Sequence, residues 1–270
     1  MVWINRLFQP RDIWIILVGV VLIQLLSIVL INRYMFHPVR EGYTESLPGY
    51  VDIGSTNDKI AAVVLGPIHG KAAIIYCHGN AEDATSVGKR FAEFVSEGYT
   101  VASVDYPGYG LSSGSPNESG CYKVVHRLYD WLQLERGFAA HEIFVVGYSI
   151  GTGVAVELAS SKKVAGLWLE APFLSAPRIV TRIRLLVVDP FPSHSRINRI
   201  NCPVVVVHGE DDRVIPFSQG KSLYERAQEP KSLIPIPGGD HTDFADVYGM
   251  VDYLDMMRKF LSENSSSREQ

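Results

Sequence analysis

The chain has 270 residues, enough for one sizeable α/β domain, and 47% hydrophobic against 20% charged residues is typical of a globular protein rather than a disordered one. Its first 40 residues hold four arginines and one aspartate, a net charge of +3, which leaves −7 of the total −4 for the remainder. This acidic remainder argues against nucleic acid as a partner. The cysteines are odd in number and lack metal-ligand spacing, so we interpret them as core thiols rather than disulfide or metal ligands: Cys77, Cys121 and Cys202.

An uncharged apolar segment covers residues 13–31, where Gln24 and Ser27 are the only strongly polar side chains. A helix of this length spans about 28 Å at about 1.5 Å per residue, close to the hydrocarbon thickness of a bilayer. A cleavable signal peptide would have a shorter apolar region and a small-x-small site, and a buried core helix would have a polar face. We therefore predict residues 1–40 as an N-terminal anchor with one transmembrane helix over 13–31, and residues 41–270 as a globular domain. Arginines flank the segment on both sides, so the orientation in the membrane stays open.

Beyond the predicted anchor, apolar runs rich in β-branched residues alternate with helical patterns. The predicted strands cover residues 50–53, 60–65, 72–77, 100–105, 143–146, 164–169, 204–207 and 233–236. The predicted helices cover residues 84–96, 116–132, 218–227 and 244–261, with one more directly after residue 149. The first two strands fit an antiparallel start, and the alternation that follows predicts a mostly parallel sheet with helices on both faces. Residues 173–201 interrupt the alternation with a Pro-rich, arginine-bearing segment, which we interpret as a short cap over the end of the sheet.

The segment Gly147-Tyr148-Ser149-Ile150-Gly151 joins the strand over 143–146 to a helix of small residues. A G-x-S-x-G pentapeptide in this context is a nucleophile elbow, in which a sharp turn exposes the serine hydroxyl and the glycines avoid collisions with neighbouring elements. Ser149 is therefore the candidate nucleophile. The helix that follows aims its N-terminal N–H groups at the site, so the backbone N–H of Ile150 is a candidate oxyanion donor.

A serine hydroxyl is a weak nucleophile, so it needs a base within hydrogen-bond reach and a third group that orients the base. For a serine on a nucleophile elbow of an α/β sheet, the chain order is serine, acid, histidine. Two loops after downstream strands supply the acid and the histidine. We assign His241 as general base and acid, and Asp212 as the orienting acid. Two other acids stay open: Asp211, which should point the other way on an extended loop, and Glu170, which ends the preceding strand.

Other polar residues at the ends of strands receive structural interpretations. His78 and His208 each precede a glycine, and we expect their side chains to organise tight turns rather than transfer protons. The loop from Asp105 to Gly110 is interpreted as a structural turn. Asp240, Asp243 and Asp246 are expected to be solvated. The loop after residue 77 should supply the second oxyanion donor, and the backbone N–H of Asn80 is the best placed group.

Five motifs in chain order carry a resemblance to a known family: the elbow, the segment His78-Gly79-Asn80-Ala81, the loop from Asp105 to Gly110, the His208 to Asp212 loop, and the segment ending in Asp240-His241. With them, residues 40–262 resemble the α/β-hydrolase superfamily. More narrowly, they are similar to its membrane-anchored branch, which includes bacterial single-span hydrolases, monoacyl-lipid lipases and protein depalmitoylases. Position by position, the resemblance implies Ser149 as nucleophile, Asp212 as acid, His241 as base, and Ile150 and Asn80 as oxyanion donors.

The sequence thus predicts an α/β-hydrolase fold with a short cap and an anchored serine hydrolase that cleaves carboxylic esters, of lipid or acyl type, through an acyl-enzyme. This chemistry needs no metal and no organic cofactor. Two activities on the same scaffold stay open, a peptidase or amidase and a thioesterase; from another class, a non-catalytic anchored scaffold also stays open. The cap either faces an anionic membrane surface and admits acyl chains, or covers the sheet with its arginines solvated.

Overall fold

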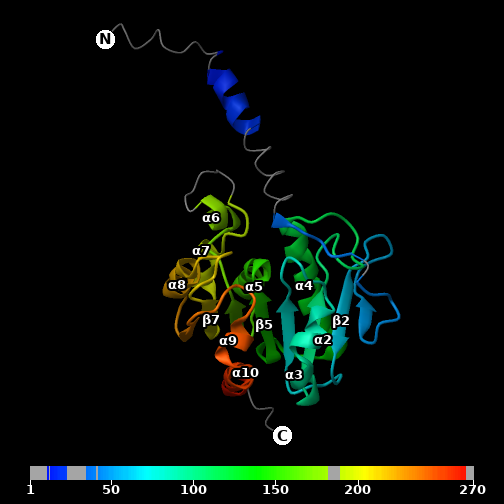
Figure 1. Cartoon of the computed structure of the whole chain (residues 1–270). Coiled ribbons are helices and arrows are strands. Elements are labelled where there is room, and N and C mark those ends of the chain that lie inside the picture. The colour runs from blue at the N-terminus through cyan, green and yellow to red at the C-terminus, as the bar shows by residue number, and fades with distance from the viewer. Residues whose placement is uncertain (1–10, 12, 23–34, 41, 182–188, 266–270) are drawn as a thin grey trace.

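An eight-stranded sheet organises the computed structural model, which describes residues 11, 13–22, 35–40, 42–181 and 189–265 (Figure 1). The strands are β1 (Tyr50–Asp52), β2 (Ala61–Leu65), β3 (Ala73–Cys77), β4 (Thr100–Val104), β5 (Ile143–Tyr148), β6 (Gly166–Glu170), β7 (Val204–Gly209) and β8 (Lys231–Ile236). Their order is β1-β2-β4-β3-β5-β6-β7-β8, and only the β1–β2 and β2–β4 pairs are antiparallel. The predicted antiparallel start and parallel remainder are both present.

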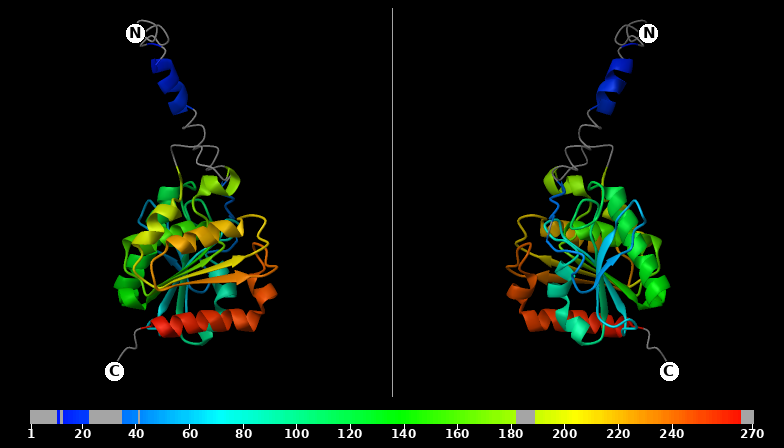
Figure 2. Two further views of the ribbon diagram at one scale, coloured as in Figure 1. Left: turned by 90° about the vertical axis from the view of Figure 1, so that its left-hand side faces the viewer. Right: turned by 90° about the vertical axis from the view of Figure 1, so that its right-hand side faces the viewer.

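Helices cover both faces of the sheet (Figure 2). They are α2 (Ser86–Arg90), α3 (Ala92–Ser96), α4 (Glu118–Arg136), α5 (Ile150–Ser161), α6 (Ala176–Thr181), α7 (Ser193–Arg196), α8 (Phe217–Arg226), α9 (Phe244–Tyr248) and α10 (Met250–Asn264). Apolar side chains of α4, α5 and α8 share one core with one face of the sheet, and those of α2, α3, α9 and α10 share a second core with the other face. Because β3, β4, β5 and β6 are covered on both sides, every residue in them is buried, which explains their continuous apolar runs.

Two helices predicted as continuous are broken, and a third begins later than predicted. The helix over 84–96 divides at Phe91, which leaves the helical conformation and packs its ring 5.3 Å from that of Tyr76. The terminal helix divides at Gly249, whose φ of 97° is readily adopted only by glycine. The helix predicted from Pro116 begins at Glu118, because Asn117 caps it by accepting a hydrogen bond from the Gly120 N–H.

The described part of the predicted cap contains α6, α7 and a short 3₁₀ helix over Ile197–Arg199, while residues 182–188 lie outside the described residues. Two of its described arginines, Arg178 and Arg196, contact other side chains, where solvation was one of the two expectations. The Arg178 guanidinium lies 3.7 Å from a carboxylate oxygen of Asp189, and Arg196 hydrogen-bonds to the Tyr122 hydroxyl. The Gln219 side chain accepts from the Leu174 N–H at 3.1 Å and donates to the Arg178 carbonyl at 2.8 Å. These contacts attach the cap to α4 and α8.

The first half of the predicted transmembrane segment is helical over residues 13–22, and its large apolar side chains are about half exposed or more. Residues 23–31, the second half, lie outside the described residues. Taken over the described ranges alone, no helix combines the length and the apolarity needed to cross a bilayer.

Candidate active site

Ser149 stands at a sharp turn between β5 and α5, in the strand-turn-helix context that the sequence predicts. Its φ of 52° and ψ of −120° are a strained combination for a non-glycine residue. A Cβ at Gly151 would lie 2.0 Å from the carbonyl oxygen of Cys77, and one at Gly147 would lie 2.8 Å from the Ala155 methyl. Both flanking glycines are therefore required by close packing of the turn against β3 and α5.

Three side chains from separate loops form one hydrogen-bonded chain. The His241 Nε2 atom lies 2.9 Å from the Ser149 hydroxyl, and the Nδ1 atom of the same ring lies 2.8 Å from Asp212 Oδ2. Asp212 follows β7 and His241 follows β8, so parallel pairing of these strands delivers both residues to the edge where β5 ends, directly before Ser149. The structure thus brings together the three residues that the sequence singled out.

The carboxylate of Asp212 is buried and held by several donors. Its Oδ1 atom accepts hydrogen bonds from the backbone N–H groups of Val214 at 2.8 Å and Ile215 at 2.7 Å. Burial by itself raises the pKa of Asp212, but hydrogen bonds from His208, His241 and the Ile215 backbone outweigh it and lower that pKa below its usual range. Asp212 is therefore an anion at neutral pH, which keeps the proton of a neutral His241 ring on Nδ1 and leaves Nε2 as an acceptor for the serine proton.

His208 also touches the acid, a contact that the sequence did not indicate. Its Nε2 atom lies 2.8 Å from the Ile215 carbonyl oxygen and 3.4 Å from Asp212 Oδ2. Because both neighbours are acceptors, Nε2 carries the proton and donates. The bond to the Ile215 carbonyl is the turn-organising contact expected of His208. The contact with Asp212 was not predicted, although the spacing of four residues between His208 and Asp212 in the sequence could have suggested it. A Cβ at Gly220 would lie 2.2 Å from His208 Nδ1, so a glycine is needed there.

The two alternative acids are placed elsewhere. Glu170 binds Arg90 and accepts hydrogen bonds from the Trp168 indole at 3.2 Å and the Tyr253 hydroxyl at 2.6 Å. Asp211 is exposed, and its backbone N–H donates to the carbonyl of Gly239. Of the three candidate acids, only Asp212 is bonded to the His241 ring.

The loops that carry the two candidate oxyanion donors leave neighbouring strands, because Cys77 at the end of β3 pairs with Gly147 on β5. The Asn80 side chain is fixed by the Tyr109 hydroxyl at 2.7 Å and by the backbone N–H of His37 at 2.8 Å. Within the part of the chain that the structure describes, the backbone N–H groups of Asn80 and Ile150 donate no hydrogen bond to another residue.

The residues interpreted as turn organisers make such contacts. The buried His78 ring stacks on Tyr106 at 4.0 Å, and its Nδ1 atom lies 2.8 Å from the Gly79 carbonyl. Asp105 is buried and accepts hydrogen bonds from the Tyr43 hydroxyl and from two backbone N–H groups, and burial raises its pKa. Neither side chain belongs to the Ser149 hydrogen-bonded chain.

One expectation for this region is wrong, because Asp240 is not simply solvated. Its carboxylate accepts hydrogen bonds from the Arg213 guanidinium and from the Arg213 and His241 backbone N–H groups. These bonds, the Arg213 side chain first, lower the pKa of Asp240 to about 2. Since Arg213 directly follows Asp212 and Asp240 directly precedes His241, this pair ties the acid loop to the histidine loop.

The cysteines are buried free thiols, as the sequence indicated. Over the described residues, no group of three or more histidine, cysteine or acidic side chains is arranged to hold a metal ion.

A mostly parallel sheet with helices on both faces and a serine at a strand-to-helix elbow defines an α/β-hydrolase. Residues 72–189 match the family model described as alpha/beta hydrolase fold. The chain is 33% identical over 217 residues to the Caenorhabditis elegans alpha/beta hydrolase domain-containing protein aho-3, covering 78% of this chain and 64% of that protein. It is 32% identical over 198 residues to the human alpha/beta hydrolase domain-containing protein 17B, covering 72% of this chain and 68% of that protein. The chain belongs to the α/β-hydrolase family.

Solved structures share the fold at low sequence identity. The Pyrococcus furiosus esterase Pf2001 aligns with a TM-score of 0.69 at 19% identity, covering 86% of this chain and 99% of that one. The monoacylglycerol lipase of Paleococcus ferrophilus aligns with a TM-score of 0.60 at 18% identity, covering 75% of this chain and 98% of that one.

Proposed function

We propose that the protein is a membrane-anchored serine hydrolase that cleaves carboxylic esters, of lipid or acyl type. The observation that carries the proposal is the hydrogen-bonded chain from the Ser149 hydroxyl through the His241 ring to the Asp212 carboxylate. The 2.9 Å between the Ser149 hydroxyl and His241 Nε2 is within the range over which a proton passes directly, and the 2.8 Å between Nδ1 and Asp212 lets the carboxylate orient the ring.

The proposed reaction is a two-step acyl transfer. His241 Nε2 takes the proton of Ser149 as the hydroxyl oxygen attacks the substrate carbonyl, and the Asp212 carboxylate stabilises the imidazolium that forms. His241 then gives this proton to the leaving alkoxide, so an acyl-enzyme remains. A water molecule, activated by the same ring, hydrolyses the acyl-enzyme and releases the acid.

The tetrahedral oxyanion requires donors that are not already engaged. The backbone N–H groups of Ile150 and Asn80 meet this requirement within the described residues, and the first also lies at the N-terminus of α5. Removal of a single such donor in other enzymes costs about 10²- to 10³-fold in kcat, so the orientation of these N–H groups affects the rate strongly.

Anchoring is supported by how the chain enters the hydrolase domain. Phe36 is buried and its ring packs 6.2 Å from that of Phe191 in the cap. The backbone N–H of the next residue, His37, donates a hydrogen bond to the Asn80 side chain. If the span ends at residue 31, only residues 32–35 separate it from this docked segment, a reach of about 14 Å when extended. Such a short connection favours a site held beside the bilayer surface, where lipid esters are concentrated.

Covalent labelling tests the activity directly. The full chain in detergent micelles, treated with a fluorophosphonate probe, should carry one adduct, and mass spectrometry should locate it on the peptide containing Ser149. A p-nitrophenyl ester series from short to long acyl chains should be hydrolysed faster than a matched anilide. A protein that the probe does not label would support the non-catalytic scaffold. Faster cleavage of the anilide than of the ester would support an amidase. Preference for an acyl thioester would support a thioesterase.

Membrane fractionation tests the anchor. The full chain should stay with membranes through an alkaline carbonate wash, because an apolar helix over residues 13–31 would be inserted rather than adsorbed. A variant that begins at Met35 retains the docked Phe36 and should be released into the supernatant. Release of the full chain by the same wash would contradict the anchor.

A further inference from the structure

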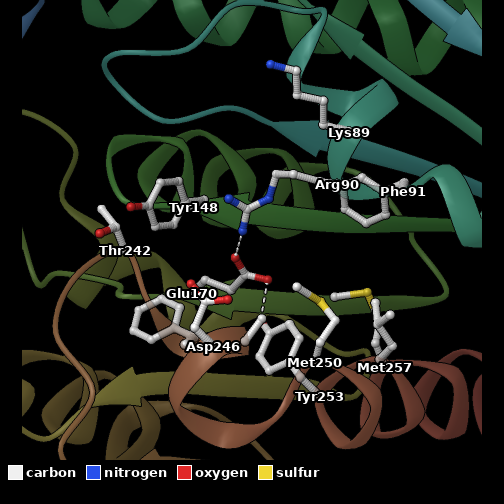
Figure 3. A pocket seen from close by; sticks show the side chains of 13 residues that line it. Lys89, Arg90, Phe91, Tyr148, Glu170, Thr242, Asp246, Met250, Tyr253 and Met257 are labelled. Atoms are coloured by element: carbon white, nitrogen blue, oxygen red, sulfur yellow. Dashed lines mark hydrogen bonds and ion pairs between the residues drawn. The ribbon is translucent and has the colours of Figure 1, made fainter.

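Arg90 occupies an unusual position behind the active site. It ends α2, and its guanidinium carbon lies 4.7 Å from the ring centroid of Tyr148 (Figure 3). The same carbon lies 5.2 Å from the ring centroid of Tyr76. These rings belong to the neighbouring strands β3 and β5. The same guanidinium binds the carboxylate of Glu170 and lies 3.6 Å from that of Glu82. The break at Phe91, which the sequence did not predict, ends the helix at this point.

The buried carboxylate of Glu170 holds the Arg90 guanidinium in place. The Glu170 side chain is 2% exposed and accepts hydrogen bonds from the Trp168 indole and the Tyr253 hydroxyl. A carboxylate this deeply buried requires a cation, because its desolvation is otherwise uncompensated. Arg90 is therefore held at one place relative to β6 and α10, and the proposed reaction makes no use of either charged group.

The first connection from Arg90 leads to the candidate oxyanion loop. Glu82 Oε2 accepts a hydrogen bond from the backbone N–H of Gly79 at 2.7 Å and from the Tyr76 hydroxyl at 2.6 Å. Gly79 directly precedes Asn80. The Glu82 carboxylate, which lies beside Arg90, thus holds the loop by a hydrogen bond one residue before the proposed oxyanion donor.

The second connection leads to the histidine loop. The Tyr148 hydroxyl donates a hydrogen bond to the His241 carbonyl at 3.1 Å, and the two rings lie 5.5 Å apart. A Cβ at Gly79 would lie 2.8 Å from the Tyr148 ring, so the oxyanion loop also rests on this ring. With Arg90 over it, the Tyr148 ring has contacts on several sides.

We infer that Arg90 is a positioning residue that sets the His241 imidazole and the Asn80 loop relative to Ser149, acting through Tyr148 and Glu82. The inference rests on the proposed serine hydrolase function and deepens it. A flat guanidinium can lie over two rings while it binds two carboxylates, whereas a lysine ammonium is a compact charge without that geometry. Displacement of a reacting group by about 1 Å costs up to about 10²-fold in rate, so a group that never touches substrate can control turnover.

A double-mutant cycle separates positioning from plain stability. Arg90→Lys keeps the positive charge beside Glu170 and should lower kcat on a p-nitrophenyl ester about tenfold, with KM changed less than twofold. Tyr148→Phe keeps the ring but removes the bond to His241 and should lower kcat about fivefold. Because both changes act through the same contacts, the double variant should lose about ten- to fifteenfold rather than the product of about fiftyfold.

Matched controls exist elsewhere in the chain. Tyr129 also donates its hydroxyl to a backbone carbonyl, that of Lys163 at 2.7 Å, and Arg258 also binds carboxylates with its guanidinium 5.8 Å from the Phe94 ring. Tyr129→Phe and Arg258→Lys should leave kcat within twofold of the wild type. Combined with Arg90→Lys, Tyr129→Phe should act multiplicatively.

A readout without turnover keeps the two proposals apart. In histidine-labelled full chain, the ring resonances of His241, assigned by loss in His241→Ala, should shift in Arg90→Lys and stay unchanged in Arg258→Lys. A wild type that hydrolyses esters while Arg90→Lys matches it in kcat and in these resonances would overturn the positioning role alone. A wild type without turnover would reject the proposed function, and the resonances would still decide whether Arg90 orients His241.

Discussion

Ser149→Ala is expected to lower ester hydrolysis by about 10⁴- to 10⁶-fold and to abolish fluorophosphonate labelling, because the bond to the acyl group is made by the missing oxygen. The fold should be unaffected, since alanine keeps the Cβ of serine and leaves the backbone at the same φ of 52°. Initial rates on a short-chain p-nitrophenyl ester, together with the thermal midpoint, check both parts of the expectation. Residual turnover should reflect only substrate binding and the oxyanion donors.

Ser160→Ala is the matched control, because Ser160 lies near the other end of α5 and its hydroxyl donates a hydrogen bond to the Glu157 carbonyl, away from the site. It should retain the rate and the labelling of the wild type. If Ser149→Ala kept even a tenth of the wild-type rate, another group would be the nucleophile and the proposed mechanism would be wrong.

Asp212→Asn should lower kcat by about 10³- to 10⁴-fold with little change in KM. The amide can donate a hydrogen bond to Nδ1 of His241, which favours the tautomer with its proton on Nε2 and leaves no acceptor for the Ser149 proton. Asp211→Asn, the same change at the exposed neighbour, should retain activity. Equal loss in both variants would show that the loop, rather than the carboxylate bonded to His241, matters.

The same substitution should remove a pH-dependent part of the free energy of unfolding. Hydrogen bonds hold the folded-state pKa of Asp212 below its unfolded value of about 3.9, so the carboxylate stabilises the fold fully above that value. This contribution is lost as the pH falls through the lower folded-state pKa. Urea unfolding should therefore show Asp212→Asn less stable than the wild type by about 1 to 3 kcal/mol at pH 7, with a smaller difference at pH 3. A constant difference would contradict the lowered pKa.

The candidate site was largely readable in advance because its residues follow local rules. The elbow needs glycines that flank Ser149 at fixed positions, and the ends of parallel strands bring loops far apart in the chain to one edge of the sheet. Asp211 was set behind Asp212 because it should point the other way on an extended loop, and Glu170 stayed open as the end of the preceding strand. Of the three acids, only Asp212 is bonded to the His241 ring in the structure.

Other features depended on side chains that meet only after folding. The split of α2 from α3 arises because Phe91 packs on Tyr76, a contact between a helix and a strand that no local pattern encodes. The ion pair of Asp240 with Arg213 joins two loops, whereas the sequence alone led us to expect a solvated Asp240.

The sequence by itself determined the class of fold and the residue types that meet at the site, because periodicity, glycine placement and strand ends are local properties. It also gave the membrane anchor as an expectation. Only the tertiary structure decided what surrounds that site: the second histidine on Asp212, the docking of Phe36 beside the Asn80 loop, and Arg90 between two tyrosine rings. These contacts join residues far apart in the chain, and their geometry is set by the packing of helices against the sheet rather than by any short stretch of sequence.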